Sequence, residues 1–144
     1  GFRKAVDALV QLHVGAEIDM VAGIEARGFI LGGAVAHQLG KGFIPVRKKG
    51  KLPWETINQE YELEYGTDTV EIHADAVPKG ANVLLIDDLI ATGGTAEAAV
   101  KLIGRAGGNV LGASFVIELP ALAGRARLEA YDIEVLSLCT FDGD

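Results

Sequence analysis

The segment VLLIDDLIATGGTA, at residues 83–96, constrains the fold of this chain more than any other part of its sequence. It begins with four consecutive apolar residues, a run that is typical of a strand buried on both faces of a parallel sheet. Asp87 and Asp88 follow at the predicted carboxyl end of this strand. In open α/β sheets, ligands bind just beyond such strand ends. The segment therefore predicts an α/β fold with a binding site beside the two carboxylates.

A loop of small residues follows the acid pair. Its hydroxyl groups and unhindered backbone amides belong to Ala91, Thr92, Gly93, Gly94 and Thr95. The alanine-rich segment AEAAVKLIGRAG after it is helical by propensity. Amides at a helix start bind phosphate through charge-assisted hydrogen bonds of roughly 1.5–3 kcal/mol each. An ordinary βα turn with a solvated acid pair is the alternative, whereas a Walker-type loop is excluded because no Gly-Lys-Ser/Thr follows.

A sugar phosphate reconciles this loop with the neighbouring carboxylates, which would repel a simple phosphate. Its phosphate can bind residues 91–95 while its vicinal hydroxyls donate hydrogen bonds to Asp87 and Asp88. The same carboxylates can hold Mg²⁺ through water. We therefore expect magnesium to be bound by the substrate and by water near Asp87 and Asp88, with no direct protein ligand.

Length, charge and cysteine content narrow the class of protein. A chain of 144 residues fits one domain, residues 1–144, with a full core, and the alternation of strand-like and helix-like segments favours an α/β fold. The net charge of −7 argues against a nucleic-acid or membrane partner. Cys139 is the single cysteine, which excludes an intrachain disulfide and indicates a reducing, cytoplasmic location.

The remaining segments alternate between helix and strand patterns. Helices are predicted at 2–13, 29–40 and 120–128, and strands at 19–24, 42–47, 109–117 and 133–139. Pro45 predicts an edge position for its strand or an early end to its pairing. Residues 59–73 alternate on both sides of 66–68, which predicts a β-hairpin, and the segment 52–59, with Trp54, is interpreted as a mobile loop over the site.

Cations gather at two places. Arg27 lies between a predicted strand and a predicted helix, where it can bind a second anionic group or form a surface ion pair with Glu25. Four of the thirteen Lys and Arg residues fall within five positions: Arg47, Lys48, Lys49 and Lys51. A charge run is usually a solvated face, but in so acidic a chain these cations also suit a polyanion.

Several motifs together resemble the type I phosphoribosyltransferases, and the adenine phosphoribosyltransferases in particular. In chain order they are EARGF, RKKGKLP, LEYG and VLLIDDLIATGGT, the same order as in that family, and the resemblance covers nearly the whole chain. The resemblance implies a mostly parallel sheet flanked by helices, with a flexible β-hairpin loop. It also implies purine salvage: adenine and phosphoribosyl pyrophosphate would give AMP and pyrophosphate, with Mg²⁺, in a cytoplasmic homodimer.

The resemblance also implies roles for single residues. Arg27, with Arg47, Lys48 and Lys51, would bind pyrophosphate, the last three in some enzymes from the neighbouring subunit. Asp87 and Asp88 would hold the ribose, and Ala91 to Thr95 the 5-phosphate. Glu64 would exchange a proton with the base, although the alternation alone makes Glu60, Glu62 and Glu64 equivalent members of one face of the hairpin.

Two other functions remain open at this point. One is transfer to another base, such as xanthine, hypoxanthine or orotate; the other is a non-catalytic regulator that binds phosphoribosyl pyrophosphate. Adenine enzymes carry an N-terminal hood segment that closes over the base, and the resemblance implies that this chain starts after it. We therefore expect base selectivity to depend partly on residues outside 1–144.

Overall fold

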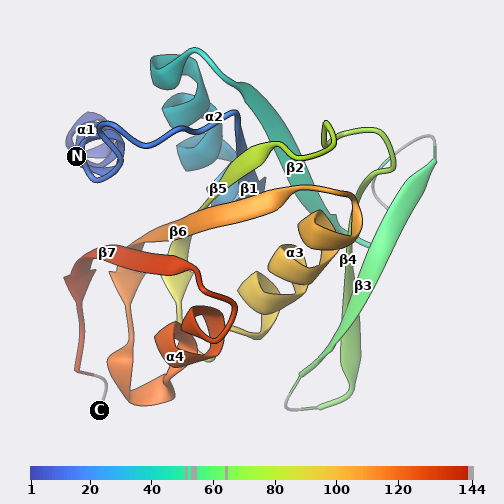
Figure 1. Cartoon of the computed structure of the whole chain (residues 1–144). Coiled ribbons are helices and arrows are strands. Elements are labelled where there is room, and N and C mark those ends of the chain that lie inside the picture. Colours follow the sequence, from blue (N-terminus) through green and yellow to red (C-terminus); the bar gives the residue numbers. More distant parts are fainter. Residues whose placement is uncertain (51, 53–54, 64, 143–144) are drawn as a thin grey trace.

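The computed structural model describes residues 1–50, 52, 55–63 and 65–142. In this part of the chain the helices are α1 (Phe2–Gln11), α2 (Arg27–Leu39), α3 (Gly94–Arg105) and α4 (Gly124–Glu129), with a short 3-10 helix, η1, at Pro120–Leu122. The strands are β1 (Met20–Ile24), β2 (Gly42–Lys48), β3 (Thr56–Glu62), β4 (Thr67–His73), β5 (Asn82–Ile90), β6 (Asn109–Glu118) and β7 (Glu134–Thr140). They form one sheet in the order β3-β4-β2-β1-β5-β6-β7 (Figure 1).

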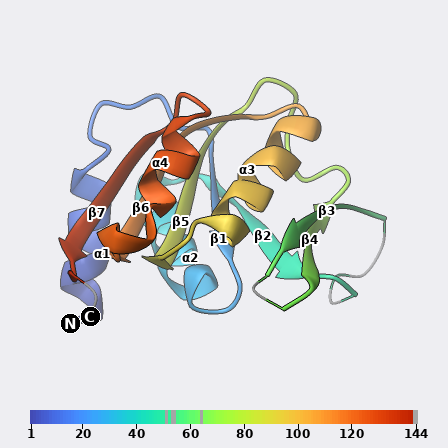
Figure 2. The ribbon, with the colours of Figure 1, turned by 90° about the horizontal axis from the view of Figure 1, so that it is seen from below.

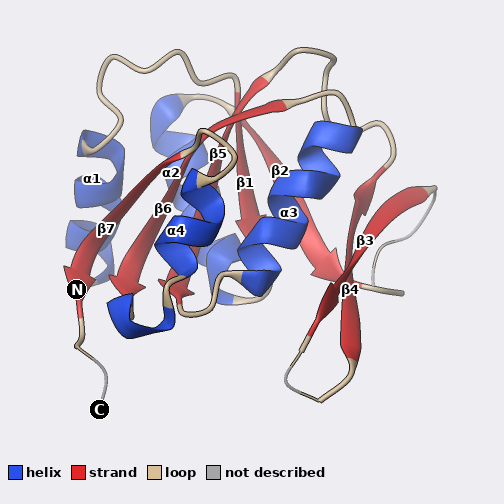
Figure 3. Ribbon diagram, turned by 60° about the horizontal axis from the view of Figure 1, so that its bottom comes forward, coloured by secondary structure: helices blue, strands red, loops and turns tan. Residues whose placement is uncertain are grey.

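The sheet is mostly parallel and lies between two layers of helices, as the sequence predicted. Strands β2, β1, β5, β6 and β7 pair in parallel. Helices α1 and α2 cover one face, and α3 and α4 cover the other (Figure 3). Alternate residues of β5 serve the two layers: Leu84 and Ile86 pack in the cluster with α1 and α2, whereas Val83 and Leu85 pack in the cluster with α3 and α4. This burial on both faces explains the uninterrupted apolar run.

Strand β5 is longer than predicted, because it does not end at the acid pair. Its pairing with β1 stops at the Gly23–Ile86 pair, but its pairing with β6 continues to Ile90 and Glu118. Asp87 and Asp88 therefore lie inside β5, in a stretch with a strand on one side only. The missing neighbour leaves room for a site beside the two carboxylates.

The predicted hairpin forms the far end of the sheet from β7 (Figure 2). The predicted turn at 66–68 was wrong: Thr67 and Asp68 already pair with Glu62 and Tyr61, so residues 63–66 connect the two strands. Part of the predicted loop at 52–59 is strand as well, since β3 begins at Thr56. Strand β4 also pairs with the end of β2, which anchors the hairpin to the sheet. Trp54 is outside the described residues.

Three smaller expectations change in the structure. Pro45 lies in an inner strand, but in the part of β2 that pairs only with β1. The predicted helix from Pro120 is broken in two, because Ala123 adopts a left-handed conformation with φ of 59° between η1 and α4. His13 lies beyond the end of α1 and is buried, where its ring hydrogen-bonds to Ser114 of β6. None of the described helices is long and apolar enough to cross a membrane.

Candidate active site

A cavity of about 290 Å³ opens where β1 and β5 end. Its walls come from three separate parts of the chain: residues 24–27 after β1, Lys48 at the end of β2, and residues 87–96 from β5 to the first turn of α3. Of the residues predicted to form a site, it brings together Arg27, Lys48, both aspartates and the whole loop 91–95. The chain thus places its acid pair, its phosphate-binding motif and an arginine around one space.

The acid pair is linked to Arg27. The Arg27 Nε atom lies 2.5 Å from Asp88 Oδ2, and the backbone amide of Asp88 donates to Asp87 Oδ1 at 2.9 Å. The partner of Arg27 is thus Asp88, not the Glu25 considered from the sequence. Glu25 instead accepts a hydrogen bond from the Lys48 amide and lies 3.8 Å from Arg47 Nε. The Arg27 side chain is 80% exposed, so its guanidinium is accessible to an anion that enters the cavity.

Burial changes the charge of the pair. Desolvation raises the pKa of Asp87 to about 8, although the hydrogen bond from the Asp88 amide and the charge of Arg27 work to lower it. Below that pH the Asp87 carboxyl is protonated, so it can donate as well as accept a hydrogen bond. The repulsion between the pair and an incoming phosphate is correspondingly reduced. With one carboxyl protonated, the pair can both donate hydrogen bonds to and accept them from the hydroxyls of a sugar.

The predicted phosphate-binding loop is a tight turn into α3. Gly93 adopts a left-handed conformation with φ of 82°, which glycine tolerates without the steric cost of a side chain. Helix α3 begins at Gly94, two residues before the alanine-rich segment that predicted it, and no side chain caps its start. Its first amides are therefore donors without an intrahelical partner, and these residues line the cavity. An anion placed there gains those donors and the positive end of the helix dipole.

The basic segment is only partly directed at this cavity. The Arg47 guanidinium lies 5.5 Å from the centre of the Phe29 ring on α2, and Arg47 is not among the residues that line the cavity. Lys48 Nζ donates to the Tyr61 hydroxyl and, at 2.9 Å, to Asp68 Oδ2 on the hairpin. Burial works to lower the pKa of Lys48, but these hydrogen bonds outweigh it and raise the pKa above its usual value. Lys51 lies outside the described residues.

A buried carboxylate that the sequence did not single out holds this segment from β4. Glu71, 3% exposed, accepts hydrogen bonds at 3.1 Å from the amides of Gly50 and of Leu52. The alternation of the hairpin predicted only that such a residue would face one side of the strand. Its partners come from a loop twenty residues away, which no local pattern indicates.

The predicted catalytic glutamate, Glu64, lies outside the described residues. Its neighbours on the hairpin, Glu60 and Glu62, are exposed, as predicted. On the other face of the hairpin, Tyr61 packs against the core, whereas Leu63 and Tyr65 are exposed. Within the described ranges no cluster of three or more His, Cys, Asp or Glu side chains could hold a metal ion.

Comparison with known proteins agrees with this geometry. Residues 2–142 match the model of the phosphoribosyl transferase domain. The chain is 82% identical over 143 residues to the adenine phosphoribosyltransferase of Parvibaculum lavamentivorans, a match that covers 99% of this chain and 82% of that protein.

Solved structures give the same result for the fold. The crystal structure of adenine phosphoribosyltransferase from Rhodothermus marinus superposes with a TM-score of 0.92 at 55% identity, covering 96% of this chain and 78% of that one. The Saccharomyces cerevisiae enzyme, crystallised with adenine and an imino-altritol bisphosphate, has a TM-score of 0.87 at 45% identity over 95% of this chain and 78% of its own. With its type I phosphoribosyltransferase fold and these relatives, the chain belongs to the adenine phosphoribosyltransferase family.

Proposed function

We propose that this chain transfers the phosphoribosyl group of phosphoribosyl pyrophosphate to adenine, giving AMP and pyrophosphate. The observation that carries the proposal is the single cavity that joins the phosphate-binding turn, the acid pair and Arg27. A ring nitrogen of adenine forms a bond to the anomeric carbon of the ribose while the bond from that carbon to pyrophosphate breaks. The proton that this nitrogen carried would be accepted by Glu64. Catalysis then comes from positioning the two reactants and from stabilising the negative charge of the leaving group.

Each part of the cavity suits one part of the substrate. Ala91 to Thr95 would bind the 5-phosphate, and Asp87 and Asp88 the ribose hydroxyls. Arg27 would bind the leaving pyrophosphate, assisted by Arg47, Lys48 and Lys51 of the basic segment. Arg47 lies over Phe29 and does not line the cavity of its own chain. The homodimer that we propose rests on the family resemblance, in which the basic segment reaches pyrophosphate in some enzymes from the neighbouring subunit.

Magnesium is the proposed cofactor. The two carboxylates at the cavity suit a water-mediated contact, and the described residues contain no three-ligand group that would bind the ion by itself. When it is bound with the substrate, the ion would supply positive charge that offsets the charge of the pyrophosphate. Asp87 and Asp88 would orient the substrate that carries it.

The proposed location is the cytoplasm, where such a salvage reaction meets its substrates. Cys139 is exposed and carries a free thiol, a state that a reducing compartment preserves.

Steady-state turnover with adenine, hypoxanthine, xanthine and orotate, each with magnesium phosphoribosyl pyrophosphate, tests the function. We expect the highest kcat/KM with adenine. Preference for another base would favour a transferase of the same class with a different substrate. Binding of phosphoribosyl pyrophosphate without turnover of any base would favour the regulator.

A further inference from the structure

The back of the phosphate-binding turn rests on the first residue of α4. The Gly124 amide donates to the Ala91 carbonyl at 3.0 Å. A methyl group built on Gly124 would lie 2.4 Å from that carbonyl oxygen and 3.0 Å from the Gly93 nitrogen. In the other direction, a methyl group on Gly93 would lie 3.0 Å from the Gly124 Cα atom. The two backbones are therefore in direct contact, with no space for a side chain on either glycine.

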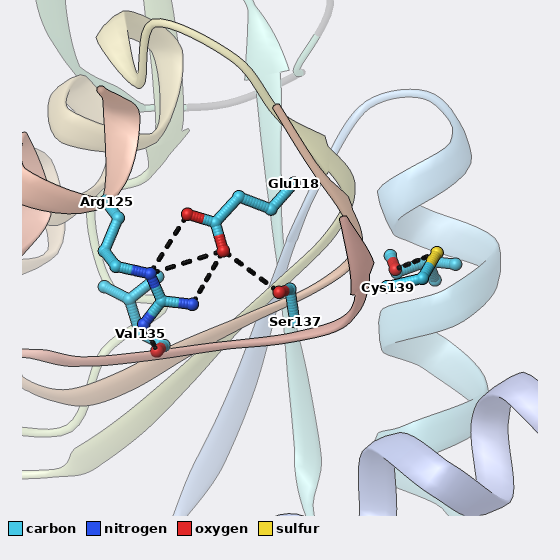
Figure 4. Close-up of polar contacts among 6 residues, drawn as sticks. Glu118, Arg125, Val135, Ser137 and Cys139 are labelled. Carbon is cyan, nitrogen blue, oxygen red and sulfur yellow. Dashed lines mark hydrogen bonds and ion pairs between the residues drawn. The ribbon is translucent and has the colours of Figure 1, made fainter. Parts of the chain in front are cut away.

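An ion pair fixes the segment that carries Gly124 (Figure 4). Arg125 Nη2 donates to Glu118 Oε1 at 2.7 Å and Nε to Glu118 Oε2 at 3.0 Å, while Nη1 donates to the Val135 carbonyl of β7. The Ser137 hydroxyl donates to the same carboxylate at 3.0 Å. Glu118 is only 3% exposed, and the hydrogen bonds from Arg125 lower its pKa. The carboxylate is thus buried and charged, with donors from both α4 and β7.

This ion pair closes a short loop of chain against the end of β5. Glu118 is the last residue of β6 and pairs with Ile90, directly before the phosphate-binding turn, and the Leu119 amide donates to the Ile90 carbonyl at 2.9 Å. The chain then leaves the sheet through η1 and returns at Ala123, whose left-handed conformation is rare for a residue with a side chain. Arg125 brings this returning segment back onto Glu118. Gly124, the residue before it, is thereby pressed against Ala91 and Gly93.

A buried ion pair is weak evidence for stability, because desolvation offsets most of its attraction, but it can select one arrangement of the chain. We propose that Glu118 and Arg125 are positioning residues for 5-phosphate binding: they hold Gly124 as a backbone support that fixes the amides of the turn at 91–95. This inference rests on the proposed function, since it assumes that the 5-phosphate binds at that turn. Neither residue lines the cavity.

Two substitutions test the support, with calorimetric titration of AMP, which carries the 5-phosphate, and of magnesium pyrophosphate, which does not. Gly124→Ala inserts a methyl group against the Ala91 carbonyl. Loss of one charge-assisted hydrogen bond at the turn corresponds to roughly a 10- to 100-fold rise in the Kd for AMP. The Kd for pyrophosphate should change less than about twofold. Gly104→Ala, on α3 where no atom lies within 4 Å of the added methyl group, is the matched control.

Arg125→Lys keeps the charge but loses the paired contact with Glu118 and the bond to Val135, so it should weaken AMP binding in the same selective way by a smaller factor. Arg105→Lys, which removes hydrogen bonds to Asn58 and Gln59 at the far end of α3, is its control. If Gly124→Ala does not fold, the result for Arg125→Lys alone tests the positioning role.

Unchanged AMP affinity in the folded variants, or equal losses for AMP and pyrophosphate, would overturn the positioning role. Failure of the unmodified chain to bind AMP would instead contradict the proposed function. The KM for phosphoribosyl pyrophosphate should rise with the Kd for AMP, whereas the KM for adenine should not. A general loss of stability would not separate the two substrates in this way.

Discussion

The two sides of the active site are built differently. The side formed by residues 87–96 continues a central buried strand, and its contacts are made largely by backbone groups, including the support from Gly124. On the second side, Lys48 at the end of β2 lines the cavity, and Tyr61 and Asp68 of the antiparallel hairpin hold it from outside the cavity. The first side can be recognised from a short motif. The second depends on tertiary partners, and the largest predicted effect falls there.

The largest effect is expected from Glu64, to which we assign proton exchange with the base. If Glu64 has no such role, the contrast between the two sides of the site is lost. Glu64→Gln should lower kcat by roughly 100- to 10,000-fold, because an amide cannot exchange a proton with the base. Glu60→Gln and Glu62→Gln, on exposed positions of the same hairpin, are the matched controls and should have almost no effect. Three similar, mild reductions in steady-state turnover would reduce Glu64 to a solvated residue of the hairpin.

Arg27 lines the cavity beside Asp88, and its removal should have the next largest effect. Arg27→Ala should lower the forward rate by about 100- to 1,000-fold, because the leaving pyrophosphate loses a charged donor. The melting temperature should barely change, because an ion pair with an 80% exposed arginine contributes little to stability. Arg3→Ala, on α1, is the control. An unchanged rate would leave Arg27 with only its ion pair to Asp88.

The burial of Asp87 predicts a pH dependence on the first side of the site. Its pKa is about 8 in the folded chain and near 3.8 when unfolded, so between these values the folded state binds the extra proton. The contribution of this proton to the free energy of unfolding is fully present below about pH 4 and is lost as the pH rises through about 8. The free energy of unfolding changes by at most about 1.4 kcal/mol per pH unit.

Urea unfolding without ligand or magnesium, from pH 5.5 to 8.5, measures this contribution as the difference in the free energy of unfolding between the wild-type chain and Asp87→Asn. The asparagine variant should gain in relative stability as the pH rises, because it has no proton to lose. A difference that stays constant over this range would contradict a raised pKa.

Lys48 should give the smallest effect. Its ammonium is already bonded to Tyr61 and Asp68, so exchanging these partners for pyrophosphate gains little. Lys48→Met should raise the Kd for pyrophosphate by about fivefold at most, the equivalent of one weak ion pair. A loss as large as that of Arg27→Ala in the same titration would show that Lys48 leaves the hairpin to bind the ligand.

Sequence patterns predicted the parallel core and the first side of the site because both depend on local order. The local pattern predicts the same structure wherever the strand lies in the sheet: an apolar run, then two acids, then a glycine-containing turn that leads to a helix. Those patterns located the end of β5 four residues too early, since only the continued pairing with β6 keeps the strand extended through Asp88.

The other misses have the same origin in tertiary contacts. The partner of Arg27 depends on the distance between the start of α2 and β5. The anchoring of Lys48 depends on the register of the hairpin. The Glu118 and Arg125 pair could not be inferred from spacing, because the break at Ala123 separates the helix that the sequence predicted as one.

The most direct test of the site asks whether the acid pair binds the ribose of phosphoribosyl pyrophosphate while Arg27 binds its pyrophosphate. Asp88→Asn keeps the shape of the side chain but removes the charge that pairs with Arg27 and that we propose faces the ribose. Calorimetry should show a roughly 10- to 100-fold loss of affinity for phosphoribosyl pyrophosphate, the equivalent of one charged hydrogen bond. Affinity for pyrophosphate alone should stay constant or improve, because Arg27 loses a competing partner. Equal losses for both ligands would contradict the assignment of the acid pair to the ribose.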